Sequence, residues 1–249
     1  MNAVRRLGCF FSILGLSLIC RAALTGEQPQ LSPFTAEYSL SRSDFTFAKV
    51  EIALTIDRRG VYRYSADTTP IGLTAVLHRD QISEISNGVI TDEGVVPQNY
   101  HYRHRNSDSP RSVDIKFDWP AMRVTNSLDG TSWSMKIQPG TQDKFSQQLS
   151  LMHAVAAGNR TVEFPVADGG RAKDYSFSFQ VEEVVDVEAG SFQSLKMARS
   201  KNRRASQASL WLAPKLNYLP VIVEKKERDG LYLMKLKRFA WTEPSTPDQ

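Results

Sequence analysis

The sequence VEIALTIDRRGVYRY spans residues 50–64 and decides the fold class. Up to Ile56, apolar side chains alternate with polar or small ones, which is typical of a strand with one buried face. The residues Asp57–Gly60 then favour a turn, because glycine adopts positive φ without steric cost. Alternation resumes at Val61, so the stretch predicts an antiparallel hairpin.

The same signal recurs along the chain. Alternating runs flank Asp129-Gly130 and Asp229-Gly230, and Asp168-Gly169-Gly170 precedes another such run at Tyr175–Val181. Repeated hairpin turns of this kind predict an antiparallel meander of about ten strands.

One segment breaks the pattern between Asp143 and Ala157. Its apolar residues Phe145, Leu149 and Met152 recur at helical spacing. Asp143 can cap the start of this helix, and Gly158 follows its end. A single amphipathic helix must bury its apolar stripe against the sheet.

These patterns predict a mainly β fold, a curled antiparallel sheet or half-barrel of about ten strands with one amphipathic helix packed on it. A closed barrel is the main alternative, since large sheets tend to curl or close. Residues 33–242 contain no composition break and are expected to form a single domain. Residues 243–249 hold two prolines and no apolar side chain, so we expect a disordered tail.

Residues 1–22 have the pattern of a secretory signal peptide. Arg5 and Arg6 precede the apolar run Cys9–Cys20, which is too short to span a bilayer, and Ala22 ends the segment with a small residue. An uncleaved anchor is the alternative. Cleavage would leave no transmembrane segment, and we expect a periplasmic location.

Removal of the signal changes the charge and the cysteine content. The chain has 31 basic and 27 acidic residues, and cleavage removes three basic ones, so the net charge falls from +4 to +1. Both cysteines also leave with the signal. The mature chain would have no disulfide, no cysteine-ligated zinc and no cysteine nucleophile, and its charge gives no reason to expect nucleic acid.

The sequence contains no recognisable catalytic, metal or cofactor motif. His101 and His104 are an odd number of residues apart on an expected strand, so they should face opposite sides and not share a metal ion. Asp114 and Asp118 lie on the same face of an expected strand, and a solvent-exposed face explains their spacing. We therefore expect no catalytic residue, no metal, no cofactor and no enzymatic activity.

Two groups of side chains are candidates for binding. The run from residue 199 to residue 204 is the strongest basic cluster, and its patch comprises Arg199, Lys201, Arg203 and Arg204. Aromatic residues on several strands would fill the concave face or line a pocket there. The predicted ligand-binding residues are Tyr62, Tyr64, Trp133, Phe177, Phe179, Trp211 and Tyr232.

Several stretches resemble the DUF3108 family of exported bacterial proteins. They cover most of residues 35–240 in the family's order, and they are Gly94–Tyr100, Phe117–Trp119, Asp143–Ser146, Tyr175–Val181, Ala189–Phe192, Leu210–Leu212 and Leu219–Val221. The resemblance implies an envelope location and a β-rich fold, and no reaction. The pattern is also similar at the level of the fold to LolA-like carriers, whose half-barrels bind acyl chains.

The sequence therefore predicts a periplasmic, non-enzymatic protein that binds or carries an apolar or lipid-like envelope ligand in a concave sheet face. An envelope assembly or scaffolding factor, with a protein partner at a sheet edge or at the basic patch, is the first alternative. A hydrolase with an unrecognised site is the second.

Overall fold

The computed structural model describes residues 31–43, 45–77, 80–105, 110–168, 170–201, 208–227 and 229–245. The expected signal peptide, residues 1–22, lies outside them, as do Arg203, Arg204 and the side chain of Lys201. The described elements are β1 (Phe34–Arg42), β2 (Phe45–Ile56), β3 (Val61–Pro70), α1 (Gly72–Leu77), β4 (Gln81–Thr91), β5 (Gly94–Arg105), β6 (Arg111–Asp118), β7 (Arg123–Leu128), β8 (Thr131–Lys136), β9 (Gln142–Asp143), α2 (Ser146–Ala156), β10 (Thr161–Asp168), β11 (Arg171–Val187), β12 (Gly190–Lys201), β13 (Ala208–Ala213), the 3₁₀ turn η1 (Pro214–Leu216), β14 (Leu219–Glu227) and β15 (Gly230–Trp241).

All strands of the described residues belong to one 15-stranded sheet, which runs in the order β8 to β1 and then β15 to β9. β1 therefore lies in the middle and pairs with both β2 and β15. The edge strands β8 and β9 are neighbours in the sequence but not in the sheet. The sheet curls until these edges face one another, and we call the gap between them the seam.

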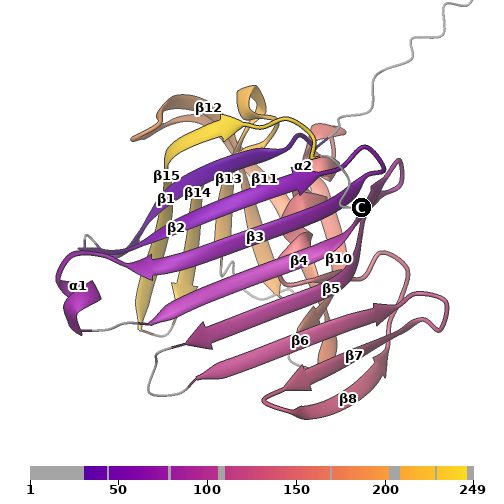
Figure 1. The fold of residues 1–249 in the computed structure, drawn as a ribbon. Helices are drawn as coiled ribbons and strands as arrows, with labels where there is room; N and C mark the ends of the chain where they lie inside the picture. Colours follow the sequence, from indigo (N-terminus) through magenta and orange to yellow (C-terminus); the bar gives the residue numbers. More distant parts are fainter. Residues whose placement is uncertain are drawn as a thin grey trace, which may run out of the picture.

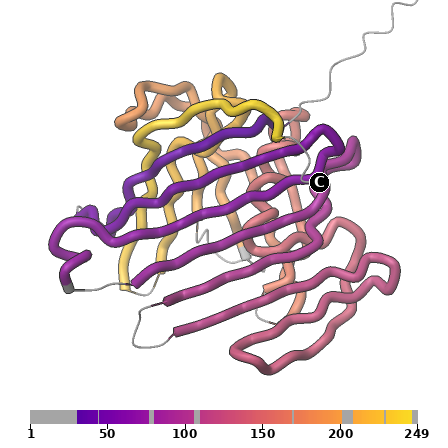
Figure 2. The backbone as a smooth tube through the Cα atoms, in the orientation of Figure 1, coloured from indigo at the N-terminus to yellow at the C-terminus, as the bar shows by residue number. Residues whose placement is uncertain are grey.

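Figures 1 and 2 show the resulting shape. The strands β1–β8 form one wall, β10–β15 form the other, and α2 lies between the two walls. The short helix α1 projects from the end of the first wall (Figure 1). The predicted curled antiparallel sheet with a helix packed on it is confirmed.

The predicted number of strands is wrong, since the described residues hold fifteen and not about ten. β9 has only two residues and all six residues of β13 are buried, so neither strand shows alternation. In β10, Val162, Phe164 and Val166 do alternate with other residues, but Pro165 weakens the strand signal. α1 was also not expected, because six residues are too few to show a helical stripe.

The predicted turns form as their sequences require. In the β2–β3 turn, Asp57 Oδ1 accepts hydrogen bonds from the backbone N–H groups of Arg59 (2.8 Å) and Val61 (2.9 Å). Asp129 and Gly130 both have positive φ, 48° and 90°, which matches the twist of two-residue hairpins.

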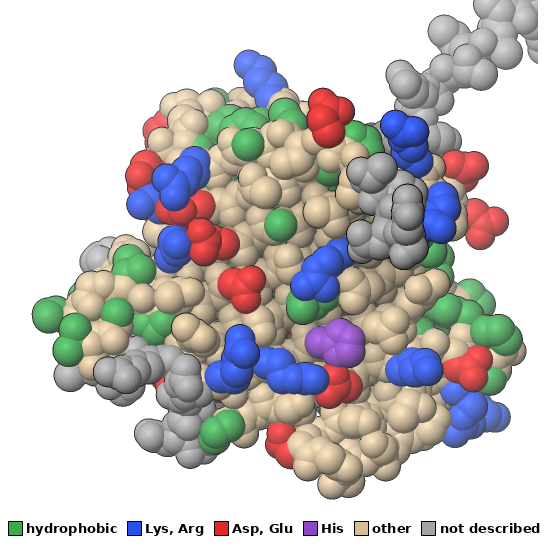
Figure 3. Space-filling model, viewed as in Figure 1, with side chains coloured by type: hydrophobic (Ala, Val, Ile, Leu, Met, Phe, Trp, Pro, Cys, Tyr) green, Lys and Arg blue, Asp and Glu red, His purple; other side chains and the backbone are tan. Residues whose placement is uncertain are grey.

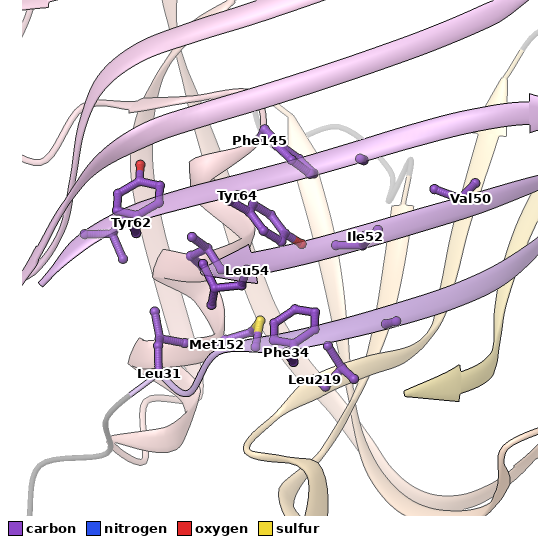
Figure 4. Packing of buried hydrophobic residues seen from close by; sticks show 14 of the residues in the cluster. Leu31, Phe34, Val50, Ile52, Leu54, Tyr62, Tyr64, Phe145, Met152 and Leu219 are labelled. Atoms are coloured by element: carbon purple, nitrogen blue, oxygen red, sulfur yellow. The ribbon is translucent and has the colours of Figure 1, made fainter. Parts of the chain in front are cut away.

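The interior near α2 is filled by side chains from both walls. The rings of Tyr64 and Phe145 stack with centroids 4.0 Å apart. Figure 4 shows Phe145 and Met152 pointing from the α2 side toward Tyr64 and Phe34 of the strands. On its other side, Leu151 and Val155 of α2 belong to a second cluster formed with β10–β14. α2 is thus the core element that joins the two walls.

Residues 243–245, assigned above to the tail, run beside the end of β2. The backbone N–H of Ser245 donates to the carbonyl of Ile56 at 3.0 Å. Residues 246–249 lie outside the described part of the chain.

Candidate ligand-binding site

The predicted aromatic residues do not converge on one cavity. Tyr62 and Tyr64 belong to the core under α2, and Phe177 belongs to the second cluster. The guanidinium of Arg160 lies 4.2 Å from the ring centroid of Phe179.

Trp211 and Tyr232 also have structural partners. The indole of Trp211 donates to Glu183 at 2.7 Å, and the ammonium of Lys196 lies 4.3 Å from its ring centroid. The hydroxyl of Tyr232 donates to Asp229 at 2.7 Å, and its ring lines a groove with Leu40 and Met234.

Trp133 is the predicted residue that lines a pocket at the seam. This pocket has a volume of about 250 Å³ and lies between the inner face of β5–β8 and the residues Lys144, Asp168 and Gly170 of the opposite edge. We call it the seam pocket.

Strand register builds the first wall of the seam pocket. Pairing across β5, β6, β7 and β8 places Tyr100, Ile115, Asn126 and Trp133 in one row on the inner face. The next row adds Tyr102, Val113 and Leu128. Apart from Asn126, these side chains offer a mostly apolar surface with two tyrosine rings.

Asn126 is the one amide in this apolar row. It is 1% exposed, and its Nδ2 has no hydrogen-bond partner among the described residues. A buried donor without a partner costs about 1–3 kcal/mol, so such a group indicates a place where a ligand oxygen or a water can bind.

The opposite wall carries charge. Asp168 accepts from Lys173 Nζ at 2.7 Å and from the Tyr175 hydroxyl at 3.0 Å, and Lys144 Nζ lies 3.9 Å away. Burial alone would raise the pKa of Asp168, but the hydrogen bond from Lys173 and the charge of Lys144 lower it below its usual value. Asp168 is therefore ionised at neutral pH and holds two ammonium groups beside the pocket.

The edges of the sheet meet where Trp133 lies on Gly170. A Cβ on Gly170 would approach Trp133 Nε1 to 2.5 Å, and Gly170 has a φ of +79°. The absence of a side chain at this position lets the indole from β8 contact the turn between β10 and β11. Trp133 thus bridges the seam beside the pocket.

We expect Gly170→Ala to lower the free energy of unfolding by about 1–3 kcal/mol more than Gly140→Ala does, because added atoms in a filled contact cause strain. Gly140 is a matched control, since its φ is +75° and a Cβ there would meet nothing within 4 Å. Chemical denaturation measures both changes. Equal losses for the two variants would show that Trp133 does not pack on Gly170.

A buried polar network lies behind the pocket at the start of α2. Ser86 Oγ donates to Asp143 Oδ2 at 2.7 Å, and the N–H groups of Phe145 and Ser146 donate to Oδ1 at 2.7 and 2.6 Å. Burial raises the pKa of Asp143 to about 6. Asp143 thus binds the first N–H groups at the start of α2, although it lies two residues before the N-cap position Phe145, and it also ties the helix to β4.

The basic patch is described only in part. Arg199 lies opposite Phe177 on β12, and its guanidinium is 4.6 Å from the ring centroid of Tyr175. Lys201, Arg203 and Arg204 have side chains outside the described residues, so the patch as a whole stays a prediction.

Sequence reasoning missed Asn126, Lys144 and Asp168. Asn126 had a usable signal, because Val124, Asn126 and Leu128 share the inward face of an alternating strand, where an amide is unusual. Lys144 and Asp168 are 24 residues apart and come together because β9 pairs with β10, which places Asp143 opposite Ala167.

The described residues contain no group of three or more His, Cys, Asp or Glu side chains that could hold a metal ion. None of the described helices is long and apolar enough to cross a bilayer.

The fold and the pocket define a β-barrel-like protein whose single curled sheet leaves an open seam. The DUF3108 family, described as a protein of unknown function, matches residues 34–237, and the chain belongs to this family. No curated protein matches the chain.

The chain is similar to two solved structures, at low sequence identity in each case. A β-barrel-like protein of the domain of unknown function DUF1849 from Brucella abortus has a TM-score of 0.55 at 12% identity, over 86% of this chain and 99% of that one. At this identity the likeness shows the fold alone.

The other is a "putative lipoprotein" from Parabacteroides distasonis, with a TM-score of 0.33 at 11% identity, over 85% of this chain and 97% of that one. A TM-score this low carries no argument. The expected likeness to LolA-like carriers is not confirmed by these comparisons.

Proposed function

We propose that this protein binds a small amphipathic ligand of the cell envelope in the seam pocket and acts without catalysis. The observation that carries the proposal is the buried Nδ2 of Asn126, which has no hydrogen-bond partner in the described part of the chain and lies in an otherwise apolar row. A ligand oxygen that accepts from Nδ2 would satisfy this donor, while Ile115 and Trp133 would contact an apolar body.

The size of the pocket limits the ligand. Its volume of about 250 Å³ lies just below the range of roughly 300–1,000 Å³ that is usual for small-molecule sites. A single acyl chain or one ring system fits this volume, whereas a two-chain lipid does not. The ligand class we propose is a medium-length acyl chain with a carbonyl or carboxylate oxygen.

The charges on the opposite wall favour an acidic end group. Lys144 lies 3.9 Å from Asp168, farther than Lys173 at 2.7 Å, and its side chain is half exposed. Lys144 can therefore turn toward a ligand carboxylate while Lys173 continues to pair with Asp168. Arg111 lines the same pocket and adds positive charge.

The location is part of the same proposal. The charged, apolar and small-residue pattern of residues 1–22 supports export to the periplasm, where acyl-containing envelope components are present. The envelope assembly role and its protein partner stay predictions from the sequence.

Decanoate tests the pocket. We expect it to change the fluorescence of Trp133 in the wild type, and Trp133→Phe should remove that change. Trp241→Phe is the control, because Trp241 lies on β15 and does not line the pocket. A change that persists in Trp133→Phe would place the ligand elsewhere.

The amide is tested separately by calorimetric titration. Asn126→Leu should weaken decanoate binding about tenfold, because a hydrogen bond to a charged group contributes about 1.5–3 kcal/mol. Thr125→Leu changes the exposed neighbour on the other face of β7 and should bind as the wild type does. If neither decanoate nor its methyl ester binds the wild type, the proposal is wrong.

A further inference from the structure

Exposed apolar side chains gather at one end of the molecule. Leu73 and Val76 on α1 are 76% and 77% exposed, and Phe45 at the start of β2 is 60% exposed. Ile71 and Leu231 are also exposed. Figure 3 shows hydrophobic side chains on the projection that α1 forms.

Pairing places these residues beside one another. The backbone N–H of Ile71 donates to the carbonyl of Phe47, so the start of α1 lies beside the start of β2. The N–H of Ser43 donates to the carbonyl of Leu231, which brings the β14–β15 turn to the same end. We call Phe45, Ile71, Leu73, Val76 and Leu231 the apolar end.

The composition of α1 differs from that of an ordinary surface helix in a soluble protein. The sequence of α1, Gly-Leu-Thr-Ala-Val-Leu, has no charged residue, and its largest described side chains point away from the core. Contiguous exposed apolar patches in soluble proteins mark contacts with a partner or with a membrane.

Basic side chains flank the apolar end on both sides. Arg42 lies opposite Phe45 in the β1–β2 pair, and Arg105 lies opposite Gln81, which follows α1 in the chain. Arg105 is exposed, as are Lys225 and Lys226 in β14. Arg42 and Lys225 pair with Asp229 and Glu227, so part of this charge is balanced.

The seam pocket belongs to the same end of the sheet. In an antiparallel meander the turns alternate between two ends, and the β5–β6, β7–β8 and β10–β11 turns lie on the side of α1. Arg111, Leu128 and Gly170, which flank these turns, line the pocket. A partner surface that contacts the apolar end would therefore also face the end of the sheet at which the seam pocket lies.

We propose that the apolar end docks on an anionic lipid bilayer, with α1 inserted at the level of the headgroups and the basic residues against the lipid phosphates. The inference rests on the proposed function, since it supplies the surface from which a lipid-like ligand is taken up or delivered. Apolar insertion combined with basic flanks is the usual chemistry of reversible membrane binding.

Vesicle flotation tests the docking. The wild type should float with vesicles of phosphatidylglycerol and phosphatidylethanolamine, and at least tenfold less with phosphatidylcholine vesicles or at high salt. The double variant Leu73→Glu/Val76→Glu should lose at least tenfold in binding. Val184→Glu is the matched control, because Val184 is an apolar β11 residue that is 63% exposed outside the apolar end.

Equal binding by the double variant and the wild type, or an equal loss in Val184→Glu, would overturn the proposal. Capture of an envelope protein by the wild type without vesicle binding would overturn it in favour of a protein partner. The double variant should still bind decanoate, and Asn126→Leu should still float with vesicles, so failure of docking and failure of the pocket are distinguishable.

Discussion

Phe145→Ala should lower the free energy of unfolding by about 3–5 kcal/mol, the usual range for a large aromatic side chain removed from a core. Phe145 is buried and stacks on Tyr64 at the point where the chain enters α2. The vacated volume would lie between the first wall and the helix, and the surrounding strands are held by backbone pairing and cannot collapse into it. Equilibrium denaturation in urea measures the change.

Phe45→Ala provides the comparison, because it deletes the same atoms from a side chain that is 60% exposed. Surface substitutions usually change stability by no more than about 0.5 kcal/mol. A similar effect of the two variants would contradict the placement of α2 as the element that joins the walls.

The fold class can be predicted from the sequence wherever a strand has one face exposed to solvent and the other face buried. In β2, Val50, Ile52 and Leu54 are buried and Glu51 is exposed, so the periodicity reports the structure directly. In β13 every residue is buried because both faces are covered. Leu210 and Leu212 belong to the cluster that contains Leu151 of α2, whereas Trp211 and Ala213 on the other face belong to the cluster that contains Leu216 of η1. Alternation then disappears, although the strand pairs with both β12 and β14.

The location of the pocket depends on contacts that sequence periodicity cannot show. The row from Tyr100 to Trp133 needs the register of three strand pairs, and a shift of one residue would turn Asn126 outward. Aromatic type alone did not distinguish Trp133 at the seam from Tyr64 in the core. Whether a concave aromatic face is filled is decided by α2, and the hydrogen bond from Ser86 to Asp143 ties the start of this helix to β4.

Asp143 should make the protein less stable as the pH rises, which is opposite to the usual effect of a carboxylate. Burial raises its pKa to about 6 in the folded protein, above its ordinary value of 3.8, although Ser86 and two backbone N–H groups favour the ionised form. The folded state therefore binds this proton more tightly than the unfolded state does. The resulting stabilisation is fully present below about pH 3.8 and is lost as the pH rises through about 6.

Asp143→Asn isolates this contribution. The free energy of unfolding of the wild type, relative to that of the variant, should fall by about 2 kcal/mol between pH 4 and pH 7, since one pKa unit corresponds to about 1.4 kcal/mol. Urea denaturation of both proteins at several pH values gives the difference. A difference that stays constant across this range would show that Asp143 is not a buried carboxylate with a raised pKa.

Asp57→Asn should show the opposite dependence and serves as the control. Burial would raise the pKa of Asp57, but hydrogen bonds from the backbone N–H groups of Val61 and Arg59 and from the Arg59 guanidinium lower it. Its contribution is present above about pH 4 and is lost only as the pH falls through its folded pKa. Between pH 5 and pH 7 the wild type should therefore lose stability relative to Asp143→Asn but not relative to Asp57→Asn, which separates the buried carboxylate at the start of α2 from a carboxylate in a hairpin turn.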